Sequence, residues 1–564
     1  MIEIKNLTFT YPAAKTPTLK NINLNIEDGD FLAIIGNNGC GKSTFCKTLN
    51  GLIPHFIDGD ITGDIFIDKT NTKEADIGQL ACKVGYVYQD FENQIVRPTV
   101  LDEASYACLN YAYEDYEEKG KKAVKLCGLE KNMNDYIWQL SGGQKHLLAL
   151  AGTISLSPNI LILDEPIAQL DPQNAKKIYD TLKMLNEKYN KTIIVIEHHT
   201  EFIAQYCKNA ILMKDGEILW KKNAKEALRD VYKLQDNNIF PPQITIAAKK
   251  LIDNNIIKNN TKKLPTTLEE GLDFFKNYKY KFNNKNNFHE IKEKKDVISF
   301  INIDVSYRAV KGKRNNIMKY MNLNIKKDEK VALIGSNGAG KSTIMKLIMG
   351  LIKQDNGNIL IDGENIKDIP YKDLSKKISL VYQNPEQMFI KDSIEEDISF
   401  ALKSRNIDNY KQKTIELLKR FNLNEIKDKD GRMLSGGQMR RASLAIGIAL
   451  NPSILLLDEP TANLDIATRK EIMKTLNDIK DITHTVIIAT HDMQLVCDWA
   501  DRIIVLSSGQ IIDDGNKDKV FSNNIVTDIM GINPPQIYSM AKMLDKQSNC
   551  YTINEFCNAF GGNA

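Results

Sequence analysis

Long hydrophobic runs are missing from this 564-residue sequence, in which no apolar stretch approaches the ~18–20 residues needed to span a bilayer. If the protein works at a membrane, other chains must therefore supply the spans. An excess of one charge is also missing, because 75 lysines and arginines stand against 72 aspartates and glutamates, and the formal net charge is +3. This balance gives no electrostatic case for a nucleic-acid binder.

Cysteine is sparse and follows no pattern. The nine cysteines form no CxxC pair and no metal-ligand spacing, which favours a reduced, cytoplasmic setting. The first residues, Met1–Lys5, resemble a strand and not a signal peptide. The apolar fraction of 42% and the charged fraction of 26% are typical of a soluble globular protein. The length predicts about two to four domains.

One glycine-rich stretch occurs twice, as Gly36–Ser43 (GNNGCGKS) and as Gly335–Ser342 (GSNGAGKS). Each follows an apolar run, Phe31–Ile35 or Val331–Ile334, and precedes a segment with helical apolar spacing. In this context the glycines let backbone N–H groups turn toward a polyphosphate, and the lysine adds a charge for its β- and γ-phosphates. The serine hydroxyl is placed to ligate Mg²⁺. The sequence therefore predicts two nucleotide sites.

The spacing of further matches indicates a tandem duplication. The two phosphate-loop lysines, Lys42 and Lys341, lie 299 residues apart, whereas Gln89 and Gln383 lie 294 apart. The difference predicts a small insertion in the first copy, near Pro54–Thr62.

The repeat sets the expected domain boundaries, which are 1–240 for a first nucleotide-binding domain, 241–280 for its C-terminal extension, 281–296 for a Lys/Asn-rich linker, 297–533 for a second nucleotide-binding domain and 534–564 for its extension. Both extensions begin with Pro-Pro-Gln-Ile, at Pro241 and at Pro534. Each also has a predicted capping box that opens a short helix, Thr267 to Glu270 and Thr552 to Glu555.

Within each copy the order of elements predicts an α/β core. Antiparallel strands come first, and a helix-rich stretch follows a strand that ends in Gln89 or Gln383. Two uninterrupted apolar strands come next in each copy. They lie at 160–163 and 193–196 in the first copy and at 454–457 and 486–489 in the second. Such strands indicate a parallel sheet covered on both faces, with the helical stretch as an inserted subdomain.

Polar residues at the ends of these strands are the candidate catalytic groups. An Asp-Glu pair ends the first strand in each copy, Asp164-Glu165 and Asp458-Glu459. The first carboxylate can hold Mg²⁺ beside the phosphate loop, and the second faces the γ-phosphate, where a base could orient water. A histidine one strand later, His198 or His491, is a candidate γ-phosphate sensor.

A Leu-Ser-Gly-Gly-Gln motif completes each copy, at 140–144 and at 434–438. The serine and glycines at a helix start can present N–H groups and a hydroxyl to an anion. Taken alone, the pentapeptide is equally compatible with a simple capped helix.

With these motifs in this order, the chain resembles the ATP-binding cassette (ABC) ATPases over nearly its whole length. The resemblance implies an α/β fold of two tandem P-loop NTPase (ABC ATPase) domains, each with a RecA-like core, an antiparallel β-subdomain, a helical subdomain and a short C-terminal extension. It also implies ATP and Mg²⁺ as cofactors.

The resemblance carries over to particular positions of this sequence. It implies catalytic roles for Glu165, His198, Glu459 and His491. It implies Mg²⁺ ligation by Ser43, Gln89, Asp164, Ser342, Gln383 and Asp458. It implies nucleotide contacts by Tyr11, Gly36, Asn37, Asn38, Gly39, Cys40, Gly41, Lys42, Ser43, Thr44, Gln89, Ser141, Gly142, Gly143, Gln144, Tyr307, Gly335, Ser336, Asn337, Gly338, Ala339, Gly340, Lys341, Ser342, Thr343, Gln383, Ser435, Gly436, Gly437 and Gln438.

In this family the Leu-Ser-Gly-Gly-Gln motif is called the signature motif, and the signature of one domain closes over the nucleotide of the other. Lys42 would therefore share an ATP with Ser435–Gln438, and Lys341 with Ser141–Gln144. Both sites keep the complete set of motifs, so both are expected to hydrolyse ATP. The tether between the copies favours this intramolecular pairing.

Two features resemble energy-coupling factor (ECF) ATPases in particular. After Gln89 and Gln383 the chain is similar to their Asn-Pro-acid-x-Gln continuation, although the first copy has Gln94 without the proline and the second has Gln387 one residue early. The Pro-Pro-Gln-Ile segments and tail helices resemble the extensions by which ECF ATPases pair. This resemblance implies a transmembrane scaffold subunit and a separate substrate-binding membrane subunit as partners, no nucleic acid, and a place at the cytoplasmic face of a bacterial-type membrane.

The cargo stays open. Residues 51–56 (GLIPHF) are similar to fused ECF ATPases associated with thiamine-type vitamin precursors, but other vitamins and transition-metal cations are equally compatible. Two other classes are alternatives. A translation-factor ABC ATPase that acts on the ribosome would need a long, basic, helical linker, and a tandem sugar-import ATPase usually has an altered second signature.

Overall fold

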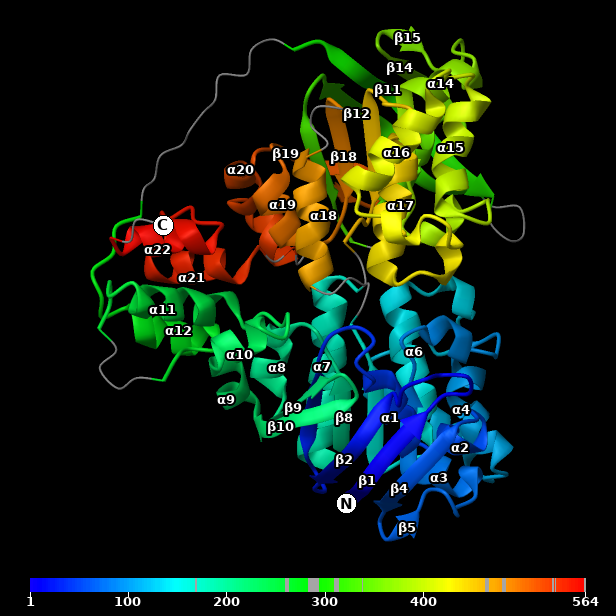
Figure 1. Ribbon diagram of the computed structural model, residues 1–564, viewed down its shortest axis with the longest axis vertical. Helices are drawn as coiled ribbons and strands as arrows, with labels where there is room; N and C mark the ends of the chain where they lie inside the picture. Colours follow the sequence, from blue (N-terminus) through cyan, green and yellow to red (C-terminus); the bar gives the residue numbers. More distant parts are fainter. Residues whose placement is uncertain are drawn as a thin grey trace. The chain divides into compact units, whose positions relative to one another are not determined.

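The computed structural model describes residues 1–167, 170–258, 263–282, 294–308, 314–336, 338–461, 466–478, 483–529, 532 and 534–561 (Figure 1). Its contacts divide the chain into two compact units, residues 1–283 with 536–564 and residues 284–535. The first unit thus holds the first copy together with the C-terminal end of the chain. The predicted linker 281–296 lies mostly outside the described residues.

The first copy begins with an antiparallel sheet of order β2-β1-β4-β5. Its strands are β1 (Ile2–Thr10), β2 (Leu19–Ile26), β4 (Asp60–Ile67) and β5 (Thr70–Asn71). In β2 the apolar residues alternate with exposed polar ones, so that one face is buried and the other is hydrated.

A six-stranded sheet of order β10-β9-β3-β8-β7-β6 forms the centre of the first copy. Its strands are β3 (Phe31–Ile35), β6 (Val84–Val87), β7 (Ile160–Asp164), β8 (Thr192–Ile196), β9 (Asn209–Lys214) and β10 (Glu217–Asn223). All pairs are parallel except β9 with β10. Every residue of β3, β7 and β8 is buried, which confirms the predicted parallel sheet with two covered faces.

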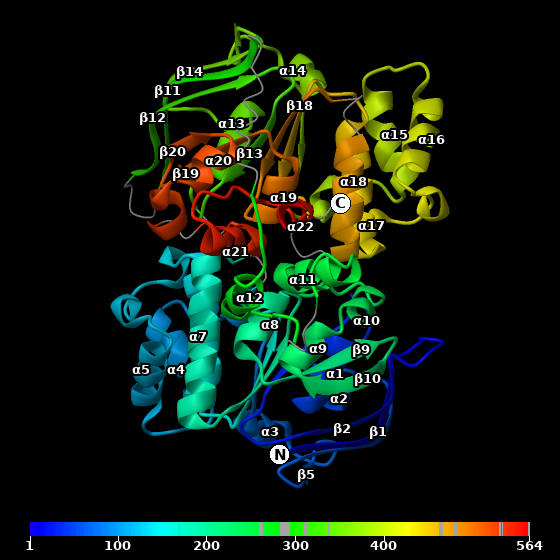
Figure 2. The same cartoon turned by 90° about the vertical axis from the view of Figure 1, so that its left-hand side faces the viewer.

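Helices join these strands. They are α1 (Lys42–Leu49), α2 (Leu52–His55), α3 (Ile77–Lys83), α4 (Val100–Asn110), α5 (Tyr116–Leu126), α6 (Gly142–Ser155), α7 (Pro172–Tyr189), α8 (Thr200–Tyr206), α9 (Ala224–Arg229) and α10 (Val231–Gln235). The 18-residue α7 runs vertically in Figure 2. Asp171 caps its start, Pro172 occupies its first position, and Asn190 ends it in a left-handed conformation.

The second copy repeats this order. Its sheets contain β11 (Asp296–Arg308), β12 (Arg314–Lys326), β14 (Asn356–Ile361) and β15 (Glu364–Asn365), and β13 (Lys330–Ile334), β16 (Ile378–Val381), β17 (Ile454–Asp458), β18 (Thr485–Ala489), β19 (Arg502–Ser507) and β20 (Gln510–Gly515). Its helices are α13 (Lys341–Ile348), α14 (Tyr371–Lys377), α15 (Ile394–Ser404), α16 (Tyr410–Arg420), α17 (Gly436–Ile448), α18 (Ile466–Asp478), α19 (Met493–Trp499) and α20 (Lys517–Phe521).

The two copies differ where the sequence predicts an insertion. Between the phosphate-loop helix and the next strand, the first copy has α2. Among the described residues of the second copy, no helix lies between α13 and β14. The strand orders are otherwise the same, so the predicted fold of two tandem α/β domains is confirmed.

The two extensions pack on each other within the first unit. Helices α11 (Gln243–Asp253) and α12 (Leu268–Phe275) of the first copy lie beside α21 (Gln536–Leu544) and α22 (Ile553–Ala559) of the second (Figure 1). Their buried apolar side chains form one cluster that includes Phe275 and Phe556.

The repeated glutamines of Pro-Pro-Gln-Ile exchange hydrogen bonds across this pair. Gln243 Oε1 accepts from the backbone N of Ile537 at 2.9 Å, and Gln536 Oε1 accepts from the backbone N of Ile244 at 3.2 Å. Each side chain thus satisfies an N–H group in the first turn of the other helix, which that helix cannot satisfy itself.

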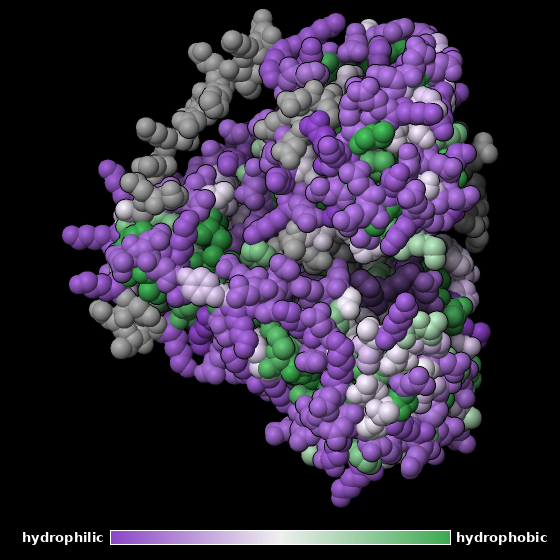
Figure 3. Space-filling model, viewed as in Figure 1, coloured by the Kyte–Doolittle hydropathy of each residue, from purple (hydrophilic) through white to green (hydrophobic). Residues whose placement is uncertain are grey.

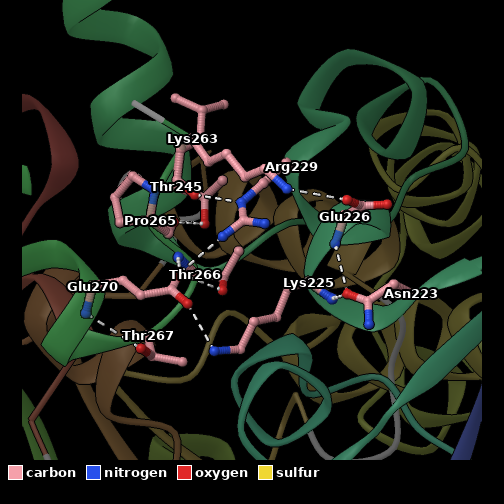
Figure 4. Close-up of polar contacts among 11 residues, drawn as sticks. Asn223, Lys225, Glu226, Arg229, Thr245, Lys263, Pro265, Thr266, Thr267 and Glu270 are labelled. Carbon is pink, nitrogen blue, oxygen red and sulfur yellow. Dashed lines mark hydrogen bonds and ion pairs between the residues drawn. The ribbon is translucent and has the colours of Figure 1, made fainter. Parts of the chain in front are cut away.

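A carboxylate fastens the first extension to the first copy (Figure 4). Glu270 accepts from Lys225 Nζ at 2.7 Å, from Arg229 at 3.2 Å and from the backbone N of Thr266 at 2.9 Å. The predicted capping box at Thr267 is therefore incomplete: Thr267 caps α12, but the Glu270 side chain is bonded one residue earlier, at Thr266. The second box, Thr552 to Glu555, is complete.

Replacing Glu270 by glutamine is expected to lower the free energy of unfolding by about 1–2 kcal/mol at neutral pH, because a charged acceptor is lost. Burial raises the pKa of Glu270, but the hydrogen bonds from Lys225 and Thr266 outweigh burial and lower it overall. The stabilisation is therefore present above the unfolded value of 4.5 and is lost as the pH falls through the lowered pKa. Urea unfolding at several pH values measures it.

The matched control is Glu269→Gln, because Glu269 is the exposed neighbour on the same turn. An equal loss of stability in both variants would contradict the role of the Glu270 cluster.

Candidate functional site

The phosphate loops join β3 to α1 and β13 to α13. Gly41 and Gly340 precede these helices with φ of 102° and 106°, a left-handed conformation that favours glycine. Lys42 Nζ donates to the backbone oxygens of Gly36 at 2.8 Å and Asn37 at 2.9 Å. Each loop thus curls around its own lysine, since Lys341 Nζ likewise donates to Gly335 O at 2.7 Å. A polyphosphate would offer that ammonium group stronger, charged acceptors.

The other residues predicted in the phosphate loops precede these two glycines. Asn38, Gly39 and Cys40, with Gly338 and Ala339 in the second copy, continue the two loops, whereas Asn337 lies outside the described residues. Burial raises the pKa of the Cys40 thiol. Among the described residues, no disulfide joins two cysteines.

The first acid of each pair lies at the end of a buried strand, next to the phosphate-loop serine. Ser342 Oγ donates to Asp458 Oδ2 at 2.8 Å. In the first copy Ser43 bonds Asp164, and the Tyr86 hydroxyl also donates to Asp164 Oδ2 at 3.2 Å. Burial raises the pKa of Asp164 and of Asp458, and the serine hydroxyls counteract this.

This oxygen donor set fits Mg²⁺. The ion is usually bound through one or two carboxylates plus the substrate phosphates. Among the described residues no group of three or more His, Cys, Asp and Glu side chains forms a metal cluster, and a nucleotide-bound Mg²⁺ does not require one.

The second acid of each pair meets the histidine. Glu165 and Glu459 have φ of 50° and 46°, which is rare for residues other than glycine and is found at functional sites. His198 Nε2 lies 3.1 Å from Glu165 Oε1, and His491 Nδ1 lies 3.0 Å from Glu459 Oε1.

Within each pair, one partner shifts the pKa of the other. Burial raises the pKa of Glu165, but the hydrogen bond and charge of His198 outweigh it, so the pKa is lowered overall. Burial lowers the pKa of His491, but the charge and hydrogen bond of Glu459 raise it overall. The structure thus holds an ionised carboxylate at the position where a base would act.

The two predicted glutamines differ in their contacts with these glutamates. Gln89 Nε2 donates to Glu165 Oε2 at 2.8 Å. In the second copy, Glu459 Oε2 is buried and has no hydrogen-bond partner in the described part of the chain, and Gln383 is exposed.

Sequence reasoning missed Glu197, which is 2% exposed at the end of β8. Its Oε1 accepts from the backbone N of His198 and of His199, both at 2.8 Å, and its Oε2 accepts from the Tyr179 hydroxyl at 2.7 Å. Glu197 therefore fixes the turn that carries His198. The signal was a charged residue that directly follows the buried apolar strand 192–196.

The signature motifs begin α6 and α17. Ser141 and Ser435 are their N-caps, and each forms a complete capping box with Gln144 or Gln438. Apart from a bond that Gln144 Nε2 donates to Asn132 Oδ1 at 3.2 Å, the described side-chain hydrogen bonds of these residues lie within the motif. Within one unit the motif is therefore a capped helix start with an exposed serine. The polar residues that converge within each unit are the lysine, serine, Asp-Glu pair and histidine, joined in the first by Gln89.

The two glycines of each signature differ in their surroundings. A Cβ added at Gly142 or Gly436 meets no described residue within 4 Å. A Cβ added at Gly143 would lie 2.5 Å from Asn174, and one at Gly437 would lie 2.6 Å from Thr468. The second glycine therefore allows close packing on α7 or α18, whereas the first leaves a surface open.

Gly437→Ala is expected to lower the stability of the second copy by about 1–3 kcal/mol, because of this overlap. Gly436→Ala is expected to leave thermal unfolding unchanged and to reduce ATPase activity, since the open surface is where a nucleotide would approach. Differential scanning calorimetry and phosphate release measure the two effects. Loss of stability in Gly436→Ala would contradict the assignment.

The two tyrosines predicted to contact the nucleotide differ in their surroundings. The Tyr11 hydroxyl lies 3.1 Å from Thr44 Oγ1 of the phosphate-loop helix, and its ring meets Phe9 edge-on. Tyr307 is 42% exposed. Thr343 continues the second phosphate loop into α13.

The face of the protein in Figure 3 is mainly hydrophilic, with hydrophobic residues in small separate groups. In the described part of the chain, no helix combines the length and apolar character needed to cross a membrane.

Each copy thus places a glycine-rich loop at a helix start, a serine–aspartate pair and a glutamate–histidine pair on one parallel sheet, and this arrangement defines a tandem P-loop ATPase. A family model described as ABC transporter matches residues 19–168 and 318–462. The chain belongs to the ABC transporter family, as an ATP-binding protein with two ABC domains that hydrolyses ATP for transport.

Several full-length relatives carry the description ABC transporter ATP-binding protein. One from Clostridium perfringens is 33% identical over 96% of this chain and 95% of its own length. One from Methanosarcina mazei is 31% identical over 97% of this chain and 94% of its own length. The solved structure of cbiO1 from Clostridium perfringens, described as part of the transporter complex cbiONQ, is 32% identical with a TM-score of 0.37, and covers 43% of this chain and 98% of that chain.

Proposed function

We propose that this protein energises an importer of the ECF type, which takes up a vitamin, a vitamin precursor or a transition-metal cation. The observation that supports this most is the pair of C-terminal extensions. Their helices bury a common apolar cluster, and Gln243 and Gln536 exchange backbone hydrogen bonds across the pair. These are the segments whose sequence resembles the ECF pairing extension.

The chemistry proposed for each site follows from the geometry above. Lys42 and Lys341 bind the phosphates, and Glu165 and Glu459 accept a proton from the attacking water. His198 and His491 hold these carboxylates in place and contact the γ-phosphate. The aspartates, with Ser43 and Ser342 and with the glutamines Gln89 and Gln383, would hold Mg²⁺, which neutralises charge on the phosphates when it is bound.

Each ATP is proposed to be shared between the copies. The phosphate loop of one copy would face the signature of the other, so that Lys42 acts with Ser435–Gln438 and Lys341 with Ser141–Gln144. ATP would then close the two copies, and hydrolysis would release them. The open surface at Gly142 and Gly436 supports this proposal, because a nucleotide could approach there without steric overlap.

Co-purification in mild detergent followed by mass spectrometry tests the proposed function. The full-length chain is expected to recover a transmembrane scaffold and a substrate-binding membrane subunit. The matched control carries Gln243→Ala and Gln536→Ala, which should weaken the extension pair without touching the nucleotide residues. Recovery of ribosomes would favour the translation-factor alternative, and recovery of a sugar permease would favour the sugar-import alternative; either would contradict the proposal.

A further inference from the structure

The two copies hold their glutamine loops by different means. In each copy the signature helix packs against the loop that follows Gln89 or Gln383. At the same position of this helix the first copy has His146 and the second has Arg440, and these side chains are 1% and 3% exposed. A neutral ring and a guanidinium therefore occupy equivalent buried places.

Arg440 bonds the loop directly. Its NH1 donates to the backbone oxygen of Tyr382 at 2.9 Å, and its NH2 donates to the backbone oxygen of Gln383 at 2.7 Å. The planar guanidinium group suits two parallel bonds of this kind. The helix that begins at the second signature is thus fastened to the backbone of Gln383 itself.

His146 makes no such connection. Among the described residues neither of its ring nitrogens has a hydrogen-bond partner, and its ring packs against Phe91 with a centroid separation of 4.4 Å. Burial lowers the pKa of His146 to about 4, so the ring is neutral at physiological pH. It fills space beneath the loop and does not anchor it.

The first copy anchors its loop through Gln94 instead. Gln94 Nε2 donates to Tyr86 O at 3.1 Å and to Thr153 Oγ1 of α6 at 3.2 Å, and Gln94 Oε1 accepts from the backbone N of Tyr88 at 3.3 Å. The equivalent residue in the second copy is Met388, which cannot form these bonds.

Beneath the two loops, the positions of a glycine and of a larger residue are also interchanged between the copies. A Cβ at Gly85 would lie 2.5 Å from Thr153, and a Cβ at Gly447 would lie 2.6 Å from Val381. The position of Gly85 is occupied by Ser379 in the second copy, and that of Thr153 by Gly447. Each anchor therefore belongs to a set of residues that fit together.

Arg440 also brings charge toward the acids of the second site. Burial lowers its pKa to about 10, while the charges of Glu459 and Asp458 counteract this, so the guanidinium stays protonated. In the first copy the neutral His146 supplies no charge, but there Gln89 bonds Glu165 directly. The two sites thus support equivalent acids in different ways.

We propose that Arg440 is the positioning residue for Gln383, and that the two glutamine loops are held by different anchors, Arg440 in the second copy and Gln94 in the first. The part of the proposal that concerns activity rests on the proposed function, because it takes Gln383 as a residue of the ATP site. The anchoring itself does not depend on it.

Hydrogen exchange measured by mass spectrometry on the full-length chain without nucleotide tests the anchoring. Arg440→Gln is expected to speed exchange in the 384–389 segment by about tenfold, which is the scale of one charge-assisted hydrogen bond. The segment 88–95 should be unaffected. Gln94→Met should have the reverse pattern, since the Tyr88 N–H loses its acceptor.

The matched control is Arg441→Gln. Arg441 is the next residue of α17 but pairs with Glu471 of α18, so its loss removes the same charge without touching the loop. The proposal would be overturned if the hydrogen-exchange rate of residues 384–389 in Arg440→Gln stayed within about twofold of the parent rate. Equal acceleration in Arg441→Gln would overturn it too, because it would indicate general loosening of the helix.

A transfer variant covers the case in which Arg440→Gln does not fold. It places the first copy's set in the second copy, as Ser379→Gly, Met388→Gln, Arg440→His and Gly447→Thr. Parent-like protection of 384–389 in this variant is expected, and loss of that protection would contradict the equivalence of the two anchors.

The effect on activity is read from the dependence of ATPase on Mg²⁺. Arg440→Gln is expected to raise the Mg²⁺ concentration for half-maximal ATPase by about tenfold with little change in ATP binding without metal, since a misplaced Gln383 would affect the metal more than the phosphates. Arg440→Lys should recover part of the effect. An unchanged Mg²⁺ dependence alongside a loosened loop would refute positioning of Gln383. A parent chain without ATPase activity would instead contradict the proposed function, and the exchange result would stand.

Discussion

Replacing both Glu165 and Glu459 by glutamine is expected to lower the ATPase rate by at least about 100-fold while ATP binding is retained. Glutamine keeps the size of the side chain but cannot accept a proton from water. The lowered pKa of Glu165 keeps that carboxylate ionised at neutral pH, so the change removes a base that is ready to act. Phosphate release gives the rate, and ATP retained through gel filtration gives the binding.

The control for this double variant is Glu118→Gln with Glu425→Gln, which removes one exposed carboxylate from each copy. The single variants Glu165→Gln and Glu459→Gln separate the two sites. If both sites hydrolyse, each single variant should retain more activity than the double. Parent-like turnover in the double variant would contradict the assignment of these residues as bases.

Much of this site follows from residue types at constant spacing. The strand–loop–helix context predicts where Lys42 lies. The apolar strands predict that Asp164 and Asp458 lie at strand ends. The structure brings these residues together because parallel strands end at one edge of a sheet, and the loops at that edge meet. Repeats and buried strands are properties of short stretches, which is why the sequence alone predicts them.

The side chains that support the site could not be predicted in the same way. Gln94 and Arg440 hold equivalent loops, but they stand at different positions of the two copies, so comparing the repeats pairs each with a residue that does nothing similar. Glu270 resembled a capping residue, yet its carboxylate bonds Lys225, Arg229 and Thr266. Such partners are set by contacts between distant segments, and spacing does not record them.

The extensions show the same limit on a larger scale. Their capping boxes predict short helices, and the resemblance to ECF extensions implies that they pair, but the sequence does not predict which helices contact one another. In the structure, α21 and α22 pack on α11 and α12, so the C-terminal end of the chain belongs to the first unit. Gln243 and Gln536 belong to the repeated Pro-Pro-Gln-Ile segments that carry the resemblance, and their role became clear only from the hydrogen bonds that they form across the pair.

Phe275→Ala is expected to destabilise this extension pair by about 3–5 kcal/mol, which is the usual effect of truncating a buried phenylalanine. Phe275 is fully buried, and its ring centroid lies 5.1 Å from that of Phe556 and 5.5 Å from that of Phe560. The truncation therefore leaves a cavity between helices of the two copies. Hydrogen exchange in residues 536–561 should accelerate far more than exchange in β3 or β7.

The expected loss is large because α21 and α22 contain only 9 and 7 residues. Isolated helices of this length are unstable in water, so they depend on the apolar cluster for their structure. Phe56→Ala is the matched control, since Phe56 is 71% exposed and its truncation leaves no cavity. If residues 536–561 stay protected in Phe275→Ala, the aromatic cluster does not hold the pair, and the exchanged hydrogen bonds of Gln243 and Gln536 must carry it instead.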